Sequence, residues 1–415
     1  MKIFKAVLIT LFLIITSETY SYELVSDTGK AHTDTLKGKA EKPEAKKTEW
    51  YQRINLRGYA QLRYNRLLET NPDLQCEQCD KSWGGDGGFF LRRLRLVLSG
   101  QITDRLYIYI QPDFASSPDG TNNHFGQIRD AYFDLGLDSK NEFRLRFGQS
   151  KVPYGFENMQ SSQNRLPLDR NDALNSAVSN ERDLGVFFYW APEKIRERFS
   201  YLVSSGLKGS GDYGVFAFGA FNGQTANKNE ANDQPHIVSR FTYPMQIGKQ
   251  IIEPSIQAYT GKYVVTSITS GVSANPKGEY KDQRAAASFV LYPQPFGLQM
   301  EYNIGTGPEY NTVTNTIEQK RLQGGYVLAS YALKFNKQVV FPFVRYFRYD
   351  GGKKFERDAR TYRVRDFEIG TEWQPVKNFE VVTMYTISKR RFEDAVKPLN
   401  DQEGRLLRIQ VQFNY

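Results

Sequence analysis

Hydrophobic and polar side chains alternate with a period of two along most of the chain after residue 52. In the first such stretch the apolar face holds Ile54, Leu56, Gly58, Ala60, Leu62 and Tyr64, and the polar face holds Arg53, Asn55, Arg57, Tyr59, Gln61 and Arg63. The stretches 89–101 and 142–150 repeat this alternation. A period of two places the two sets on opposite faces of a β-sheet, so the chain is predicted to be built from strands.

About sixteen strands are predicted from this pattern. They span 53–66, 89–101, 104–115, 128–137, 142–150, 184–191, 212–222, 236–243, 250–261, 282–292, 296–305, 322–332, 339–349, 362–374, 379–389 and 405–415. Sixteen is an even number within the range of bacterial outer-membrane barrels. The predicted fold is therefore all-β, a transmembrane antiparallel barrel in the bacterial outer membrane.

The lengths of the predicted connections support a membrane barrel. Long connections at 67–88, 116–127, 262–281, 306–321 and 390–404 alternate with short ones at 102–103, 138–141, 293–295 and 375–378. Short periplasmic turns and long outer loops are typical of such barrels. One connection, 192–211, is long where a short turn is expected and contains the strand-like stretch 199–204, which would change the strand count by up to two.

The two ends of the chain add to this interpretation. Leu407, Ile409, Val411, Phe413 and Tyr415 alternate with polar residues up to the last position, as expected of a closing strand with an aromatic at the membrane interface. At the other end two lysines precede the apolar run 6–15, which is typical of a secretory signal peptide. We expect a signal peptide at 1–21, a flexible periplasmic segment at 22–49 and the barrel at 50–415.

Composition narrows the chemistry. With 3 His and 2 Cys the chain is too poor in these residues for a metal-rich enzyme, and His236 and Ser239 would face opposite ways on one strand. We therefore expect no enzyme activity, no cofactor, no metal and no nucleic-acid partner. After the N-terminus no uninterrupted apolar run approaches the roughly 18 residues that a membrane helix needs, which excludes a helical membrane protein. Cys76 and Cys79 lie in the first long loop of an exported chain and are predicted to form a disulfide.

Arginines are concentrated on the predicted polar face of the first five strands. A sixteen-stranded barrel is wide enough for an aqueous channel, and rings of Arg or Lys favour anions. The predicted pore-lining, anion-binding residues are Arg57, Arg63, Arg93, Arg95, Arg144, Arg146 and Lys151. Acids such as Asp113, Asp130 and Asp134 fall on the same face, so a wet interior of both signs is the competing interpretation.

The longest predicted connection is 151–183, which carries Lys151, Arg165, Arg170 and Arg182. A long loop in a wide barrel can fold inward and narrow the lumen, where a few charges then control selectivity. A solvated surface loop is the alternative.

Part of this region resembles a known family. Gly148-Gln-Ser-Lys-Val-Pro-Tyr-Gly-Phe-Glu157 resembles the G-Q-x-K-x-P-[FY]-G-x-E signature of the phosphate-selective porins of the porin O/P family, and shorter likenesses occur at 91–95, 129–132 and 221–223. The resemblance implies a homotrimeric outer-membrane porin whose third outer loop folds into the lumen and whose arginines guide phosphate or polyphosphate to a lysine-lined constriction. The matched positions are Arg93, Arg95 and Lys151. The chain departs from the family in having few inward lysines on its first five strands.

Three functions remain open from the sequence. The first is passive diffusion of small anions, with phosphate or polyphosphate as partners in addition to outer-membrane lipid. The second is a general or oligosaccharide porin in which Tyr59, Tyr107 and Tyr109 form a path for sugars. The third is a structural or adhesive barrel that displays its loops.

Overall fold

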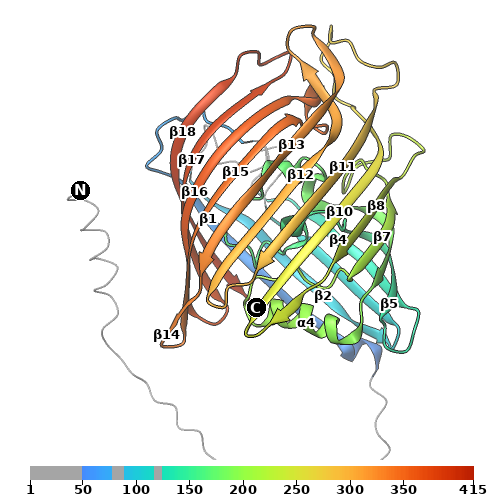
Figure 1. The fold of residues 1–415 in the computed structure, drawn as a ribbon, viewed down its shortest axis with the longest axis vertical. Helices are drawn as coiled ribbons and strands as arrows, with labels where there is room; N and C mark the ends of the chain where they lie inside the picture. The colour runs from blue at the N-terminus through green and yellow to red at the C-terminus, as the bar shows by residue number, and fades with distance from the viewer. Residues whose placement is uncertain (1–48, 77–87, 116–123) are drawn as a thin grey trace, which may run out of the picture. The chain divides into compact units, whose positions relative to one another are not determined.

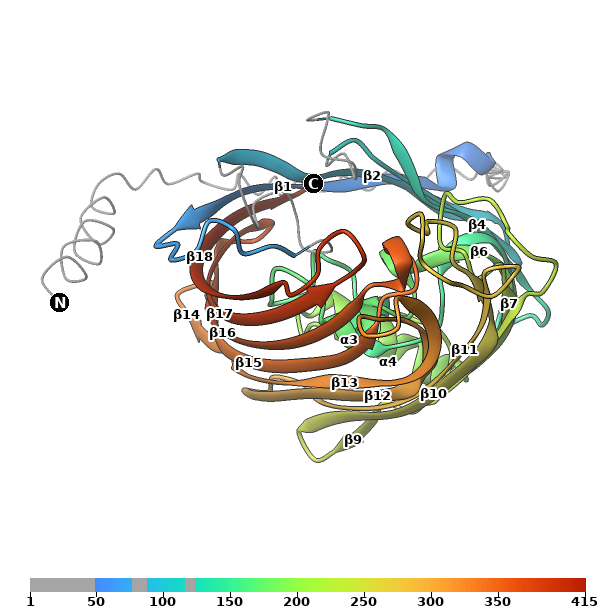
Figure 2. The ribbon, with the colours of Figure 1, turned by 90° about the horizontal axis from the view of Figure 1, so that it is seen from above.

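The computed structural model describes residues 49–76, 88–115 and 124–415, which form one antiparallel sheet (Figure 1). The sheet contains 18 strand segments, and its first and last, β1 (Ile54–Leu67) and β18 (Asp401–Asn414), pair with each other. This pairing closes the sheet into a barrel, which Figure 2 shows from above. The predicted signal peptide 1–21 and residues 22–48 of the predicted periplasmic segment lie outside the described residues.

The other elements follow the order predicted from the alternation. The strands are β2 (Phe89–Thr103), β3 (Leu106–Asp113), β4 (Gln127–Gly136), β5 (Phe143–Lys151), β6 (Arg182–Trp190), β7 (Phe216–Phe221), β8 (His236–Thr242), β9 (Met245–Ile247), β10 (Gln250–Val264), β11 (Glu279–Leu291), β12 (Phe296–Asn311), β13 (Thr316–Tyr331), β14 (Leu333–Phe335), β15 (Gln338–Gly352), β16 (Thr361–Val376) and β17 (Phe379–Glu393). The helices are η1 (Trp50–Arg53), α2 (Phe156–Met159), α3 (Asp172–Asn175), η2 (Ser179–Glu181), α4 (Glu193–Ser204) and η3 (Arg357–Ala359).

Two of the barrel strands are interrupted. β8 and β9 both pair with β10 on either side of Tyr243 and Pro244, and β13 and β14 both pair with β15 on either side of Ala332. Counting each interrupted strand once, the 18 segments form sixteen barrel strands. The predicted closed antiparallel barrel of sixteen strands is confirmed. Within the described ranges, no helix is both long and apolar enough to cross a membrane.

The predicted long connection at 306–321 is wrong. β12 continues to Asn311 and β13 begins at Thr316, so the two strands are joined by four residues only. Gly307 and Pro308 in this stretch, and Gly305 just before it, resemble turn residues in the sequence. In the sheet Gly305 is required by close packing, because a Cβ there would lie 2.2 Å from the carbonyl oxygen of Gln283 on β11.

The strand-like interpretation of 199–204 is also wrong, because these residues belong to helix α4. Its apolar side chains Ile195, Phe199 and Leu202 are spaced four and three residues apart and are all buried. That spacing is the helical period, and Pro192 occupies the N-cap position just before the helix, with a non-helical ψ of 146°. The helix therefore packs its apolar face at the short-turn end of the barrel without adding a strand (Figure 1).

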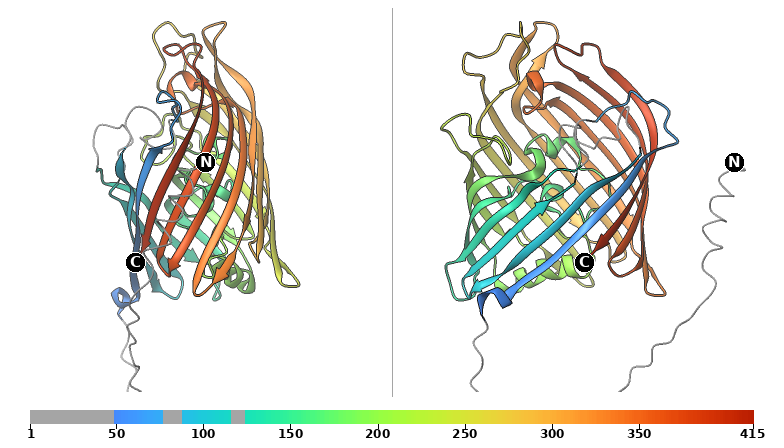
Figure 3. Two further views of the ribbon diagram at one scale, coloured as in Figure 1. Left: turned by 90° about the vertical axis from the view of Figure 1, so that its left-hand side faces the viewer. Right: turned by 180° about the vertical axis from the view of Figure 1, so that it is seen from behind.

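The barrel wall has a low side and a high side. Strands β3 to β7 are 6 to 10 residues long, whereas β10 to β13 and β15 to β18 are 13 to 16 residues long. In the right-hand view of Figure 3 the shorter strands end well below the tops of the longer ones. The chain ends at the short-turn end, where Tyr415 and Gly58 exchange backbone hydrogen bonds of 2.8 and 3.0 Å.

Candidate permeation pathway

The connection between β5 and β6, residues 152–181, lies inside the barrel. Figure 2 shows its helix α3 within the ring of strands. Most of its side chains are buried, and its two short helices α2 and α3 contain buried charged and polar residues. Tyr154 donates its hydroxyl to Asn303 on β12, and the backbone N–H of Phe156 donates to Glu301 at 2.9 Å. The segment therefore crosses to the high wall and is hydrogen-bonded to it.

Arg345 on β15 joins this loop to the high wall. Its guanidinium lies 2.6 Å from the loop carboxylate Glu157 and 2.6 Å from the wall carboxylate Glu368, and it donates to the carbonyl of Asp169 at 2.9 Å. Arg345 is fully buried. Buried charges are stable only when paired and fully hydrogen-bonded, so this arginine and its carboxylates depend on each other.

Further ion pairs join the loop to the wall or join neighbouring wall strands beside it. They are Arg63–Asp169 at 3.3 Å, Lys353–Asp172 at 2.6 Å, Arg390–Asp172 at 3.1 Å, Arg408–Asp169 and Arg390–Asp366. Among the described residues, these pairs bring together five cations (Arg63, Arg345, Lys353, Arg390, Arg408) and five carboxylates (Glu157, Asp169, Asp172, Asp366, Glu368). The charges balance, so these groups mainly fasten the loop.

The other side of the loop faces the low wall, where Lys151 and Arg95 lie. The Lys151 ammonium donates to the loop carbonyls of Met159 and Gln160 at 2.6 and 3.0 Å. Arg95 lies 2.7 Å from the Asp113 carboxylate and donates to the Tyr59 hydroxyl at 2.8 Å. Lys151 is thus held against the loop by two carbonyls, and Arg95 contacts the loop through a hydrogen bond of 3.4 Å to the Ser162 hydroxyl.

Like Lys151, Arg93 and Arg165 have no carboxylate partner among the described residues, whereas Arg95 is paired with Asp113. Arg93 donates to the amide oxygen of Gln61 at 2.8 Å, and Arg165 donates only to the carbonyls of Pro167 and Leu168. Among the described residues no carboxylate lies within ion-pair distance of either, and the buried Nε of Arg93 and Nη1 of Arg165 have no hydrogen-bond partner there. The two guanidinium groups act electrostatically on each other.

Three more arginines, Arg129, Arg170 and Arg182, surround Glu181 at the end of the loop. Arg170 and Arg182 each lie 2.7 Å from the Glu181 carboxylate, and Arg129 lies 3.5 Å from it. Burial raises the pKa of Glu181, but these guanidinium groups outweigh it and lower that pKa well below its usual range. Glu181 is therefore ionised at any relevant pH.

We call the buried cations of this side the luminal basic cluster: Arg93, Arg95, Arg129, Lys151, Arg165, Arg170 and Arg182. The carboxylates that pair with them are Asp113, Asp130 and Glu181. Seven cations thus meet three carboxylates, in contrast to the balanced high wall. An excess of fixed positive charge next to a water-filled lumen attracts anions and repels cations.

A hollow at the short-turn end continues this charge excess. It has a volume of about 320 Å³ and is lined by Arg105, Arg144, Arg146 and Arg196 against Asp134 and Asp212. Arg146 holds Asp134 with two hydrogen bonds of 2.7 and 2.8 Å, and its guanidinium lies 3.8 Å from the centre of the Tyr132 ring. Arg144 lies 2.8 Å from Asp212.

The predicted site residues therefore fall into four places. Arg93, Arg95 and Lys151 lie together in the luminal basic cluster, and Arg144 and Arg146 line the hollow below it. Arg57 is exposed near the short-turn end, 5.9 Å from the Tyr109 ring, and Arg63 belongs to the balanced high wall.

Sequence reasoning missed part of the luminal basic cluster. Arg165, Arg170 and Arg182 were noted only as charges of the long loop, and Arg129 only within a family likeness. Arg129 does not follow simple alternation, because the β3–β4 register shifts between Gln111 and Pro112. That shift leaves both Arg129 and its neighbour Asp130 buried.

Cys76 is disulfide-bonded, and the one other cysteine of the sequence, Cys79, lies outside the described residues. The Cys76–Cys79 pairing stays a prediction. Within the part of the chain that the structure describes, no group of three or more His, Cys, Asp or Glu side chains is arranged to hold a metal ion.

The sequence of residues 73–415 matches the family model described as phosphate-selective porin O and P. Among curated proteins no sequence matches the chain significantly.

Several solved structures share the fold. The outer membrane channel DcaP of Acinetobacter baumannii aligns with a TM-score of 0.56 at 14% identity, over 87% of this chain and 97% of that chain. OmpF of Salmonella typhi, in complex with daunomycin, gives 0.52 at 14% identity over 87% and 97%. An anion-selective porin from Comamonas acidovorans gives 0.50 at 10% identity over 87% and 99%. At these identities the likeness establishes the fold alone.

Proposed function

The chain belongs to the phosphate-selective porin O and P family and is an outer-membrane porin, and we propose that it conducts small anions, with phosphate and polyphosphate preferred. The observation that carries this proposal is the unequal charge on the two sides of the inward loop. Among the described residues, the seven cations of the luminal basic cluster share three ion-paired carboxylates, whereas the ion pairs that fasten the loop to the high wall contain five cations and five carboxylates.

Two features of the cluster favour phosphate within the class of anions. Arg93 and Arg165 are buried, carry no carboxylate partner among the described residues and each have an unused N–H donor. Guanidinium groups bind phosphate oxygens in pairs and keep their charge at all relevant pH values. A phosphate passing between loop and low wall would supply the acceptors that these donors lack.

Planar-bilayer recording of the purified protein in a salt gradient tests anion preference. Arg165→Gln removes one cluster charge, and for an ion about 7 Å away in water this costs an anion roughly 0.6 kcal/mol and favours a cation equally. The anion-to-cation permeability ratio should then fall roughly sevenfold at low ionic strength. Arg321→Gln, an exposed arginine on the outward face, is the matched control and should leave the ratio unchanged. A wild-type channel that prefers cations would refute the proposal.

Phosphate preference needs a second measurement. Added phosphate should reduce the chloride current of the wild type at lower concentrations than sulfate does, and Arg93→Gln should weaken this block. Equal block by both anions would leave a general anion channel and reject the phosphate preference.

Oligosaccharide passage is the second candidate, and one observation favours it. Tyr109 and Tyr132 stack with ring centres 5.1 Å apart, and Tyr107 and Tyr132 line the hollow at the short-turn end. Aromatic faces of this kind bind sugar rings. Tyr59 does not contribute, because it is buried with its hydroxyl bonded to Ser162 and Arg95. Block by maltodextrins where phosphate has no effect would favour this candidate.

We also propose a homotrimer that associates through the low wall. A membrane strand needs roughly 9–11 residues to cross the bilayer. β3 has 8 residues and β7 has 6, so these two strands are too short to face lipid over the full membrane thickness, whereas β4, β5 and β6 have 9 or 10 residues. Two further copies packed against the low wall would cover the shortfall. Cross-linking through a cysteine introduced at the exposed position of Phe133 on β4 should give trimers, and the same change at Phe367 on β16 should not.

A further inference from the structure

The outward faces of β15, β16 and β17 change from apolar to basic at one level. Tyr346, Phe367 and Ile387 lie opposite one another in the sheet and face outward. Two residues further toward the long-loop end, Arg348, Arg365 and Lys389 occupy the next outward row in the same register. A row of aromatic and aliphatic side chains followed directly by a row of cations marks the upper boundary of the hydrocarbon-facing belt.

We call the cations above this boundary the outer basic patch: Arg321, Arg348, Arg363, Arg365, Lys389 and Arg391. Within it, Arg348 pairs with Arg365, Arg365 with Lys389, and Arg363 with Arg391. Like charges directly opposite each other destabilise a sheet. The carboxylates near them are Asp350, Glu393, Asp401 and Glu403, four against six cations.

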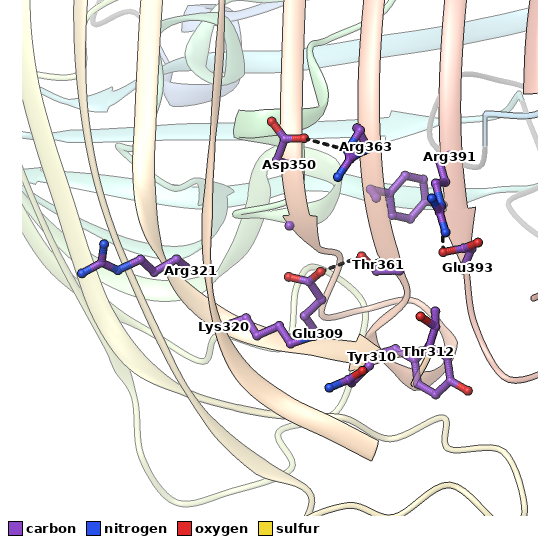
Figure 4. A pocket seen from close by; sticks show the side chains of 13 residues that line it. Glu309, Tyr310, Thr312, Lys320, Arg321, Asp350, Thr361, Arg363, Arg391 and Glu393 are labelled. Atoms are coloured by element: carbon purple, nitrogen blue, oxygen red, sulfur yellow. Dashed lines mark hydrogen bonds and ion pairs between the residues drawn. The ribbon is translucent and has the colours of Figure 1, made fainter. Parts of the chain in front are cut away.

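A hollow of about 510 Å³ opens within the patch (Figure 4). It exists because β13 pairs with β15 only as far as Gln323 and Asp350, while both strands continue beyond that point with other partners. Lys320, Arg321, Arg363 and Arg391 line it, together with Glu309, Asp350 and Glu393. Each of these acids already has a partner: Thr361 donates to Glu309, Arg363 lies near Asp350, and Arg391 lies near Glu393.

Among the cations that line the hollow, Arg321 is the one without a carboxylate partner in the described parts of the chain. It is exposed on the outward face, and in the described parts of the chain no carboxylate lies within ion-pair distance of it. Figure 4 shows its side chain extending away from the acids of the hollow. The hollow can therefore accept additional negative charge.

We propose that the outer basic patch binds the phosphorylated headgroup of a glycolipid in the outer leaflet. The patch lies at the long-loop end, which faces outward in bacterial outer-membrane barrels. It is continuous with the apolar belt, so a lipid whose chains lie along Tyr346 and Phe367 has its phosphates at the level of the cations. Clusters of Lys and Arg next to a membrane-embedded surface bind anionic headgroups, and guanidinium pairs with phosphate in bidentate geometry. This binding is independent of ion passage through the lumen.

Native mass spectrometry of the full-length protein in neutral detergent tests the proposal, with bisphosphorylated lipid A as the probe. The test variant is the triple substitution Arg321→Gln, Arg363→Gln and Arg391→Gln. With about fivefold lost for each interfacial charge, its affinity for lipid A should fall roughly 100-fold. The matched control is Lys334→Gln, Lys337→Gln and Lys377→Gln, three exposed cations at the short-turn end of the same part of the wall, and it should change the affinity less than about threefold.

Two comparisons identify the ligand. Dephosphorylated lipid A should bind the wild type as weakly as lipid A binds the test variant, and inorganic phosphate at millimolar concentration should fail to displace lipid A. Displacement by free phosphate would show an anion site and overturn the lipid assignment. Equal losses in the test and control variants would show unspecific attraction and overturn it as well.

Folding and transport are monitored separately. Heat-modifiable gel mobility reports the folded barrel. If the triple variant does not fold, Arg321→Gln alone, at an exposed position without an ion pair, should still lower the affinity about fivefold, and no change would overturn the proposal. The anion-to-cation permeability ratio should be unchanged in all these variants, so that failure of lipid binding is distinguishable from failure of the anion-channel proposal.

Discussion

Arg345 is the residue whose removal should release the inward loop most directly. Arg345→Gln deletes a charge that lies 2.6 Å from Glu157, 2.6 Å from Glu368 and 2.9 Å from the carbonyl of Asp169. Two buried carboxylates then lose their closest cation. Their desolvation is no longer compensated, and the change weakens the contact between loop and high wall.

The magnitude follows from what each carboxylate keeps. Glu157 still accepts hydrogen bonds from the backbone and side-chain amides of Asn171 at 2.8 and 2.6 Å. Glu368 keeps Arg408 at 3.7 Å. Breaking a buried ion pair costs about 3–5 kcal/mol, and these remaining partners place the expected loss of unfolding free energy near the lower value, about 3 kcal/mol.

The assay combines stability with conductance. Urea titration of the folded barrel in detergent measures the free energy of unfolding, and single-channel recording measures the open lumen. We expect lower stability, higher conductance and weaker anion preference, because a released loop no longer narrows the channel. Arg348→Gln is the matched control, three residues along the same strand and outward-facing. Its guanidinium donates to the Tyr302 hydroxyl at 2.9 Å and its loss should cost below about 1 kcal/mol.

The reasoning is refuted if Arg345→Gln and Arg348→Gln have the same stability and the same conductance. A double variant sharpens the test. Adding Glu157→Gln to Arg345→Gln removes one of the uncompensated charges. The loss of unfolding free energy in the double variant should therefore be smaller than the sum of the losses in the two single variants. Simple additivity would show that the two side chains do not interact.

Three further predictions concern charge, covalent structure and the helix at the short-turn end. Because neighbouring guanidinium groups lower the pKa of Glu181, the stability that its carboxylate contributes is present above its ordinary pKa and is lost only when the pH falls through the lowered pKa. The anion-to-cation permeability ratio should therefore stay constant between pH 7 and pH 5. Glu181→Gln should raise anion preference at pH 7. Thiol titration of the unreduced, denatured protein should find no free thiol, whereas two thiols would reject the Cys76–Cys79 disulfide. Phe199→Asp buries a charge in the apolar face of α4 and should lower unfolding free energy by about 3 kcal/mol or more, while Tyr201→Asp, at a position that is 50% exposed, should change it by less than about 1 kcal/mol.

The strands and the site were predictable to different degrees. Alternation identified the barrel strands because each has one apolar and one polar face, and this signal needs no knowledge of partners. It failed at 306–321, where β12 and β13 continue as paired strands through Gly307 and Pro308, and at α4, where the apolar stretch 199–204 hid a helical spacing. In both segments the local residue pattern fits more than one secondary structure, and the contacts with neighbouring strands decide which one forms.

The candidate site shows the same limit more clearly in Arg63 and Arg93. Both lie on inward faces of neighbouring strands, and their local sequences do not distinguish them. Arg63 meets Asp169, more than a hundred positions later in the chain, and becomes part of a balanced contact. Among the described residues Arg93 donates to the neutral Gln61 and has no carboxylate partner.

The sequence by itself determined that this chain forms a closed barrel and that arginines face its interior, because a side chain's face depends only on whether its position is odd or even within a strand. Only the tertiary structure decided which arginines are neutralised. That outcome depends on where the loop 152–181 meets the two walls, and electrostatic pairing acts over a few ångströms between residues that the sequence holds far apart.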